Sequence, residues 1–304
     1  MNNRAEMIEK FQIACPDALI LTDEPMNKHT TFRVGGPADI MIQPTTPEEA
    51  VAAIRTAKEA GVPVFVMGNG SNLVVKDGGM DGVVVLLGEK MSAIRCEGTR
   101  LYAQAGALLS RLSREALNAG LEGLVFASGI PGTVGGAVAM NAGAYGGEMK
   151  DVLVRARVLV NDELIWMTKD ELDMGYRTTR PLREGGIVLE AEFELKQGDK
   201  DALTVQTQEL ARKRREKQPL AFPSAGSTFK RPEGYFAGAL IEQAGLKGAS
   251  VGGAQVSTLH AGFVINTGNA TASDILGLIA HVQKVVYDIN GVMLEPEVRI
   301  VGRD

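Results

Sequence analysis

An uncharged, glycine-rich stretch is the feature that most constrains how this chain folds. The segment SGIPGTVGGAVAMNAGAYG, residues 128–146, carries glycine at six positions and has no charged side chain. Glycine leaves its N–H group uncovered and lets another group approach the main chain closely. Two interpretations follow from the residues alone: the stretch is a tight crossing between domains where helix and strand backbones pack closely, or a large ligand lies along the main chain.

A second glycine loop, GNGSN at residues 68–72, separates two apolar runs. An Asn-Gly pair is typical of a β-hairpin turn, and such a loop can also close its amides around an anion. The first loop has GxxGxxG spacing instead of the GxGxxG of dinucleotide-binding folds, and neither loop carries a P-loop lysine. A bulky polyanionic cofactor, bound in a site of another architecture, would explain both loops together.

The composition is typical of a soluble globular protein with more than one folded unit. The chain has 304 residues, of which 45% are hydrophobic and 23% are charged. No apolar run approaches the roughly 20 residues that span a bilayer, and the N-terminus lacks the apolar core of a secretory signal. The net charge of −5 argues against nucleic-acid binding. We therefore expect a cytoplasmic protein that binds neither nucleic acid nor membranes.

Cysteine and histidine are too sparse for a metal motif. Cys15 and Cys96 lack CxxC spacing and the three histidines are scattered, so we expect neither a disulfide framework nor a metal site. One basic cluster, ARKRREKQP at residues 211–219, has two interpretations. It is the solvated end of a helix, or it binds a phosphate-bearing small molecule.

Apolar periodicity and turn residues predict several folded units with mixed helices and strands. We divide the chain into residues 1–90, a more strand-rich unit at 91–197, a third unit at 198–290 and a C-terminal segment at 291–304. The predicted helices are at 45–61, 108–120, 202–217, 235–244 and 272–290, and the predicted strands are at 62–68, 82–88, 101–106, 152–160, 187–196, 254–257 and 262–266.

Six motifs link the chain to a known family. They are TTFRVGGPAD (30–39), GNGSNLVV (68–75), the stretch at 128–146, YRTTR (176–180), PSAGSTFKRP (223–232) and LEPEVRIVG (294–302). In this order they resemble the flavin-dependent UDP-N-acetylenolpyruvoylglucosamine reductases of peptidoglycan synthesis, and the resemblance runs from end to end. It implies an α+β chain: an FAD-binding fold of the vanillyl-alcohol-oxidase type, made of two α+β subdomains, and a C-terminal α+β substrate-binding domain.

The resemblance implies FAD as cofactor and NADPH as co-substrate, although no ribose-phosphate motif separates NADPH from NADH. By this analogy residues 68–72 wrap the pyrophosphate, and residues of the longer glycine stretch line the flavin and its ribityl chain. The cofactor-binding residues implied are Gly68, Asn69, Gly70, Ser71, Asn72, Pro131, Gly132, Thr133, Gly135, Gly136, Gly143, Tyr145 and Ile187.

Three residues match the family's catalytic groups. Ser227 matches the proton donor, which the resemblance implies protonates the substrate carbon after hydride has been added. Arg177 matches the arginine that holds the substrate carboxylate and the developing enolate, a task that suits a planar guanidinium. Glu297 matches the second glutamate of LEPEV, and a carboxylate there must be protonated or hydrogen-bonded. Without the resemblance, Ser227 is interpreted as a turn serine, Arg177 as part of a surface ion pair and Glu297 as a glutamate on an edge strand.

The implied substrate is UDP-N-acetyl-enolpyruvoylglucosamine, and the protein is expected to be a monomer. The substrate-binding residues that the resemblance implies are Tyr176, Lys217, Arg231 and Gln255. Arg231 departs from the asparagine found at the matching position in some relatives. The chain lacks the tyrosine-bearing insertion of the family's longer branch and so resembles the compact branch. The alternatives are an FAD oxidase or dehydrogenase for another substrate, and a flavin-binding regulator without turnover.

Overall fold

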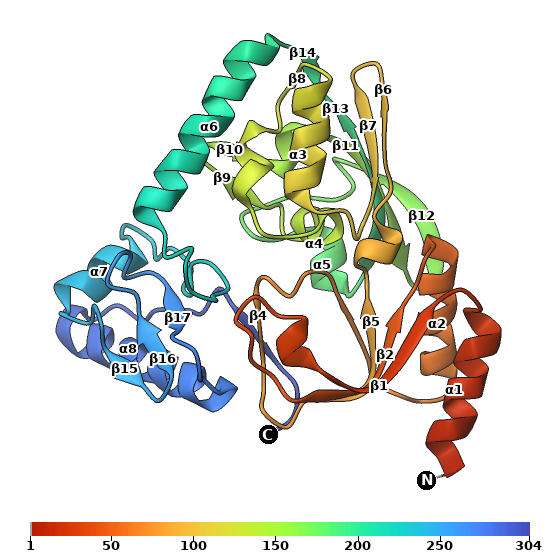
Figure 1. Ribbon diagram of the computed structural model, residues 1–304, viewed down its shortest axis with the longest axis horizontal. Helices are drawn as coiled ribbons and strands as arrows, with labels where there is room; N and C mark the ends of the chain where they lie inside the picture. Colours follow the sequence, from red (N-terminus) through yellow and green to blue (C-terminus); the bar gives the residue numbers. More distant parts are fainter. Residues whose placement is uncertain (1) are drawn as a thin grey trace. The chain divides into compact units, whose positions relative to one another are not determined.

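The computed structural model describes residues 2–304, which form two compact units (Figure 1). Unit 1 holds the described residues up to Thr22, together with Ile40–Asn69 and Gly82–Arg212. Unit 2 holds Asp23–Asp39, Gly70–Asp81 and Lys213–Asp304. The predicted boundaries at 90, 197 and 290 stay a prediction.

Helices and strands are interspersed along residues 2–304. The α-helices of the described residues are α1 (Asn2–Ala14), α2 (Pro47–Glu59), α3 (Leu109–Asn118), α4 (Val134–Ala139), α5 (Arg180–Glu184), α6 (Lys200–Lys217), α7 (Ala237–Gln243) and α8 (Ala272–Asn290). The strands are β1 (Leu19–Pro25), β2 (Pro37–Gln43), β3 (Val64–Met67), β4 (Leu73–Val75), β5 (Met80–Leu86), β6 (Ile94–Glu97), β7 (Arg100–Gln104), β8 (Leu121–Glu122), β9 (Gly143–Ala144), β10 (Gly147–Glu148), β11 (Leu153–Val160), β12 (Glu163–Thr168), β13 (Ile187–Glu194), β14 (Lys196–Gln197), β15 (Ser250–Val251), β16 (Ala254–Val256), β17 (Val264–Asn266) and β18 (Arg299–Val301).

A five-stranded antiparallel sheet forms the larger part of unit 1. Its strand order is β12-β11-β13-β7-β6 (Figure 1). Leu112 of α3 and Val138 of α4 share one buried cluster with Ala156 and Phe193 of the sheet. The glycine-rich stretch contains α4, so hydrophobic burial fixes that stretch against β13.

A second core of unit 1 lies around α2 and strands β3 and β5. Thr46 caps α2 by accepting a hydrogen bond from the Glu49 N–H at 3.1 Å, and Pro47 occupies the first helical position. β3 pairs with β5 in parallel, within a sheet of order β1-β2-β5-β3. Ile54 of the helix and Val83 of β5 are fully or almost fully buried in this core.

Unit 2 is built around α7, α8 and the three-stranded sheet β15-β16-β17. The α8 helix begins with a capping box, in which Thr271 and Asp274 each accept a hydrogen bond from the other's N–H. It ends at Gly291, whose φ of +68° is the left-handed conformation of a glycine cap. The C-terminal strand β18 pairs in parallel with β4.

The predicted helices and strands are found with small shifts at their ends, whereas the hairpin interpretation of residues 68–72 is wrong. β3 and β4 flank this loop but belong to different sheets: β3 pairs with β5 and β4 pairs with β18. The loop is therefore a crossing between sheets, and its glycines need another explanation.

Candidate active site

The glycine-rich stretch packs closely against its own unit at the start of α4. The N–H groups of Val134 and Gly135 donate to the carbonyls of Ala107 and Ala105, at 2.8 and 2.9 Å. A Cβ at the buried Gly135 would lie 2.7 Å from the Ala105 Cβ and 3.1 Å from the Val188 carbonyl oxygen. Close main-chain packing within unit 1 therefore explains this glycine, and these two amides are already occupied.

Two other glycines of the stretch, Gly136 and Gly146, are open. Gly136 is exposed, and a Cβ there would have the Thr133 hydroxyl, 3.8 Å away, as its nearest neighbour. Gly146 has a φ of +89° and open space around it, and Tyr145 beside it is half exposed. Main chain that is uncharged, uncovered and next to an exposed aromatic ring fits a flat, largely apolar ligand.

The first half of the GNGSN loop contacts the stretch within unit 1. A Cβ at Gly68 would collide with the Thr133 hydroxyl, and the Asn69 side-chain amide donates to the Pro131 carbonyl at 3.0 Å. The two loops that the sequence singles out are therefore neighbours here. Ile187, another predicted cofactor residue, begins β13 and packs partly buried beside the second core.

The second half of the loop lies in unit 2, where the TTFRVGG segment supports it. Gly70 accepts a hydrogen bond from the Thr31 N–H at 3.3 Å, and a Cβ at Gly70 would collide with the His29 carbonyl oxygen. The Thr31 hydroxyl is buried and has no hydrogen-bond partner in the described part of the chain. A buried hydroxyl is normally satisfied, so this atom suits a ligand at the loop.

Tyr176 and Arg177 lie at the tip of a tight turn in unit 1. Gly175 and Thr178 exchange main-chain hydrogen bonds at 2.9 and 3.4 Å across the base of the turn. Arg177 has a φ of +55°, a conformation that is uncommon for residues other than glycine. Its guanidinium lies 5.5 Å from the Tyr176 ring centroid and 3.5 Å from the Gly143 carbonyl oxygen, so it faces the glycine-rich stretch.

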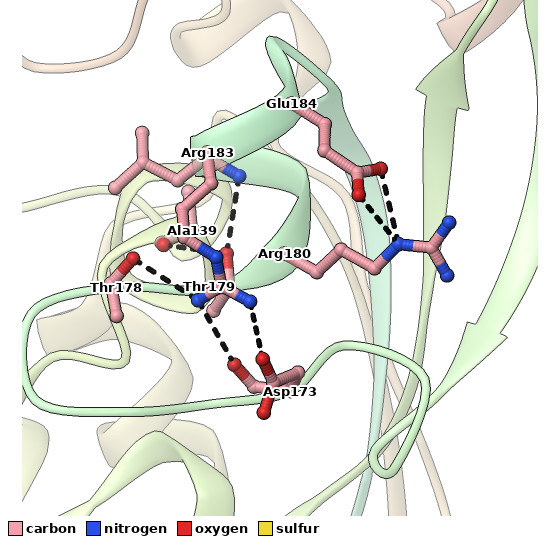
Figure 2. Close-up of polar contacts among 8 residues, drawn as sticks. Ala139, Asp173, Thr178, Thr179, Arg180, Arg183 and Glu184 are labelled. Carbon is pink, nitrogen blue, oxygen red and sulfur yellow. Dashed lines mark hydrogen bonds and ion pairs between the residues drawn. The ribbon is translucent and has the colours of Figure 1, made fainter.

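Figure 2 shows how the chain after this turn is held. The buried Thr179 hydroxyl donates to the Ala139 carbonyl at 2.8 Å, which ties the turn to the end of α4. Arg183 binds the Asp173 carboxylate and the Thr178 hydroxyl. Arg180 pairs with Glu184 one turn along α5. The neighbouring arginines are thus held in structural ion pairs.

Ser227 and Glu297 lie on adjacent segments of unit 2. The Glu297 N–H donates to the Thr228 carbonyl at 2.8 Å, and Phe229 and Pro296 form an antiparallel bridge. Thr228 is fully buried and its hydroxyl accepts from the Val264 N–H, which fixes this residue beside the exposed Ser227. Two residues far apart in the sequence are therefore placed side by side through their main chains.

The other predicted substrate residues of unit 2 lie on α6, on a loop and on β16. Lys217 is the exposed last residue of α6. The Arg231 guanidinium stacks 4.0 Å from the centroid of the exposed Phe236 ring. The Gln255 side-chain amide, on β16, donates to the Gly248 carbonyl and the Ser250 hydroxyl. Of these three side chains, the Gln255 amide is thus held by hydrogen bonds to the protein.

Two asparagines were assigned no structural role from the sequence. Asn141, inside the glycine-rich stretch, is buried and bonded on every side, and Asn72 donates to the Glu297 carbonyl at 3.0 Å. Their distant contacts have no local sequence signature, because Asn141 binds the Gly175 main-chain carbonyl and Asn72 binds that of Glu297.

Residues 2–304 contain no cluster of three or more His, Cys, Asp or Glu side chains arranged to hold a metal ion. Across the same range, no helix has both the length and the apolar character that crossing a bilayer requires.

Comparison with known proteins defines the class. Residues 38–168 match the model of an FAD binding domain, and residues 218–301 match that of the UDP-N-acetylenolpyruvoylglucosamine reductase C-terminal domain. The match to an FAD-binding domain and the open, uncharged main chain at Gly136 and Gly146 agree, so the residues of unit 1 fit the cofactor. The fold and the site thus define a flavin-dependent oxidoreductase of the predicted α+β class.

Relatives bearing one name cover almost the whole chain. UDP-N-acetylenolpyruvoylglucosamine reductase of Alkaliphilus oremlandii is 52% identical over 290 residues, 95% of either chain. That of Clostridium botulinum is 50% identical over 305 residues, 100% of this chain and 99% of the relative. The crystal structure of the Thermus caldophilus enzyme superposes with a TM-score of 0.79 at 36% identity, over 93% of this chain and 98% of that one. The chain belongs to the UDP-N-acetylenolpyruvoylglucosamine reductase family.

Proposed function

We propose that this protein reduces UDP-N-acetyl-enolpyruvoylglucosamine to UDP-N-acetylmuramate with NADPH, as a cytoplasmic monomer in peptidoglycan precursor synthesis. The observation that carries the proposal is the near-complete match to reductases of that name at 50–52% identity, with Arg177, Ser227 and Glu297 all present. A flavin oxidase for another substrate would not need this set of three.

FAD, when bound, would supply the transfer of hydride from NADPH to the enolpyruvyl double bond. Residues 68–72 would hold its pyrophosphate, and Gly136 and Tyr145 would lie along the flavin. Thr31 would add a hydroxyl donor beside Gly70. The open main chain at Gly136 and the unpartnered Thr31 hydroxyl support this arrangement.

Arg177 would bind the substrate carboxylate and stabilise the negative charge that develops once the methylene carbon is reduced. A guanidinium can donate two parallel hydrogen bonds to two oxygens, which an ammonium cannot do. The tight turn with its left-handed Arg177 supports a group held in one orientation.

Ser227 would donate the proton to the adjacent carbon. A serine hydroxyl is a weak acid, so it must already be positioned against a strongly basic carbon. The buried Thr228 next to it, fixed by hydrogen bonds on both its main chain and its hydroxyl, supports such positioning. Glu297, whose N–H donates to the Thr228 carbonyl, would contact the substrate on the side that receives the proton from Ser227. Tyr176, Lys217, Arg231 and Gln255 would contact the UDP-sugar.

The test is NADPH oxidation that depends on the enolpyruvyl substrate, with the two half-reactions followed separately by flavin absorbance. We expect NADPH to reduce the bound flavin in the wild type and in S227A, E297Q and R177K. Only the wild type should then reoxidise the flavin rapidly with the enolpyruvyl substrate, because each variant lacks a group for that step. Reoxidation by oxygen but not by this substrate would establish the oxidase alternative instead. Reoxidation at the wild-type rate in S227A would remove the serine from its role.

A further inference from the structure

We infer that Asn141 is a positioning residue for Arg177, although it lies inside the stretch assigned to the flavin. The inference rests on the proposed role of Arg177. The basis is that the Asn141 side-chain amide donates to the Gly175 carbonyl, in the turn that carries Arg177, and to the Glu148 carboxylate.

The Asn141 carboxamide is fully used by the protein. Its Nδ2 donates to the Glu148 carboxylate at 2.7 Å and to the Gly175 carbonyl at 3.0 Å, and its Oδ1 accepts from the Lys150 N–H at 3.0 Å. An asparagine amide has two N–H donors, and both are engaged. With 2% of the residue exposed, the side chain has no donor to offer a cofactor.

The orientation of the amide is determined by its neighbours. Two acceptors face Nδ2 and one donor faces Oδ1, so the flipped amide would place oxygen against oxygen. Glu148 stays ionised, because the hydrogen bond from Lys150, that from Asn141 and the positive charge of Arg177 hold its pKa below the ordinary value. The left-handed backbone of Asn141, with a φ of +43°, is one that asparagine tolerates.

The contact with Gly175 controls one end of a four-residue turn. Arg177 lies two residues beyond Gly175 in a left-handed conformation, which persists only where the surroundings impose it. Thr179 fixes the other end through the Ala139 carbonyl, as Figure 2 shows. Both anchors connect the turn to the chain around the end of α4, so Asn141 and Thr179 together set where the guanidinium lies.

The experiment uses the FAD-loaded protein and the substitution Asn141→Asp, which keeps the shape but replaces both donors with an oxygen. We expect FAD content and the rate of flavin reduction by NADPH to be unchanged. Flavin reoxidation by the enolpyruvyl substrate should slow by roughly 10- to 100-fold, the size of effect expected from displacing a reacting group. The matched control is Asn161→Asp, the same change in an exposed turn residue with a φ of +48°. It should leave every rate unchanged.

A second measurement separates positioning from general damage. If Asn141 acts through Arg177, adding Asn141→Asp to Arg177→Ala should slow reoxidation by less than roughly twofold further. The inference is overturned if the single variant loses FAD, if it slows flavin reduction, or if it slows the Arg177→Ala protein as much as the wild type.

Two further controls keep the result interpretable. Should Asn141→Asp not fold, Asn141→Gly removes the same bonds while accepting the positive φ, and the same outcomes apply. A wild-type rate in Arg177→Ala alone would instead refute the proposed role of Arg177, whatever the Asn141 variants do.

Discussion

The Asn72 side-chain amide donates a hydrogen bond to the Glu297 carbonyl, with 3.0 Å between nitrogen and oxygen. The Asn72 carbonyl in turn accepts from the Arg299 N–H at 2.9 Å, where β4 and β18 begin to pair. Glu297 is bonded on its other edge to Thr228, next to Ser227. The end of the GNGSN loop, Glu297 and Ser227 thus lie on three consecutive hydrogen-bonded segments.

Asn72→Ala tests whether this contact matters for turnover. The loss of one hydrogen bond to a main-chain carbonyl should cost about 0.5–1.5 kcal/mol in the free energy of unfolding. Because the Glu297 carbonyl loses this hydrogen bond, we also expect substrate-dependent flavin reoxidation to slow by roughly three- to tenfold in protein saturated with FAD, with NADPH-dependent reduction of the bound flavin unchanged. Denaturant unfolding and the two half-reactions measure these effects. A loss of stability with an unaltered reoxidation rate would leave Asn72 with a structural role only.

The six motifs form two groups in space. In unit 2, the segments at 30–39, 70–75, 223–232 and 294–302 are joined by main-chain contacts: Thr31 with Gly70, Glu297 with Thr228, and β18 with β4. In unit 1, the stretch at 128–146 and the turn at 176–180 are joined through Asn141 and Thr179. Each group holds its own share of the proposed catalytic residues.

The paired glycines of α4 give a matched test of packing against ligand binding. Gly135→Ala should lower the stability of FAD-free protein by about 1–3 kcal/mol, because the new methyl would overlap the Ala105 Cβ and crowd the Val188 carbonyl. Gly136→Ala meets open space and improves helix propensity, so the stability should stay equal or rise by up to about 1 kcal/mol. Thermal unfolding of the FAD-free proteins measures both.

The same pair separates the two interpretations of the stretch. If Gly136 lines the flavin, Gly136→Ala should weaken FAD binding in a fluorescence titration while the FAD-free protein stays stable. Unchanged FAD affinity in Gly136→Ala would mean that the stretch is glycine-rich for packing alone.

Local sequence signals were sufficient to locate the helices and strands, but they did not identify which strands pair with each other. Thr46 and Pro47 mark the start of α2, and the structure starts the helix there. The Asn-Gly pair at residues 69–70 gave a hairpin signal, yet the flanking strands pair with β5 and with β18, more than 200 residues beyond β4. A turn signal reports the backbone conformation of a few residues and contains no information on distant strands.

The candidate site divides in the same way. Ser227, Arg177 and Glu297 could be proposed as catalytic residues from the sequence, because each lies in one of the six motifs that resemble the family. The supporting contacts of Asn72 and Asn141 could not be predicted from the sequence. They bind main-chain carbonyls, which every residue possesses, so no residue type at a fixed spacing identifies the partner.

The two cysteines should differ in reactivity. Burial, followed by the charge of Glu49, raises the pKa of the Cys15 thiol to about 11, and its Sγ lies 3.3 Å from the Glu49 carbonyl. Cys96 is exposed. At about pH 8, a thiol reagent should therefore modify Cys96 rapidly and Cys15 only after unfolding. Mass spectrometry of briefly labelled protein checks this. Fast labelling that persists in Cys96→Ser would show that Cys15 is accessible.

The start of α8 should contribute to acid stability. The Asp274 carboxylate accepts hydrogen bonds from the N–H groups of Thr271 and Gly253, in that order of effect, and these hold its pKa below the ordinary 3.8. A carboxylate with a lowered pKa stabilises the folded state above its unfolded pKa, and this contribution disappears as the pH falls through the folded value. Wild type should therefore exceed Asp274→Asn in stability at neutral pH, and the two should converge below about pH 4.

The matched control is Asp288→Asn in the last turn of the same helix, where the carboxylate forms an exposed pair with Lys284. Its effect should stay within about 0.5 kcal/mol at neutral pH. Thermal unfolding across this pH range measures all three proteins, and a gap between wild type and Asp274→Asn that does not narrow in acid would mean that the carboxylate's charge is not what stabilises the cap.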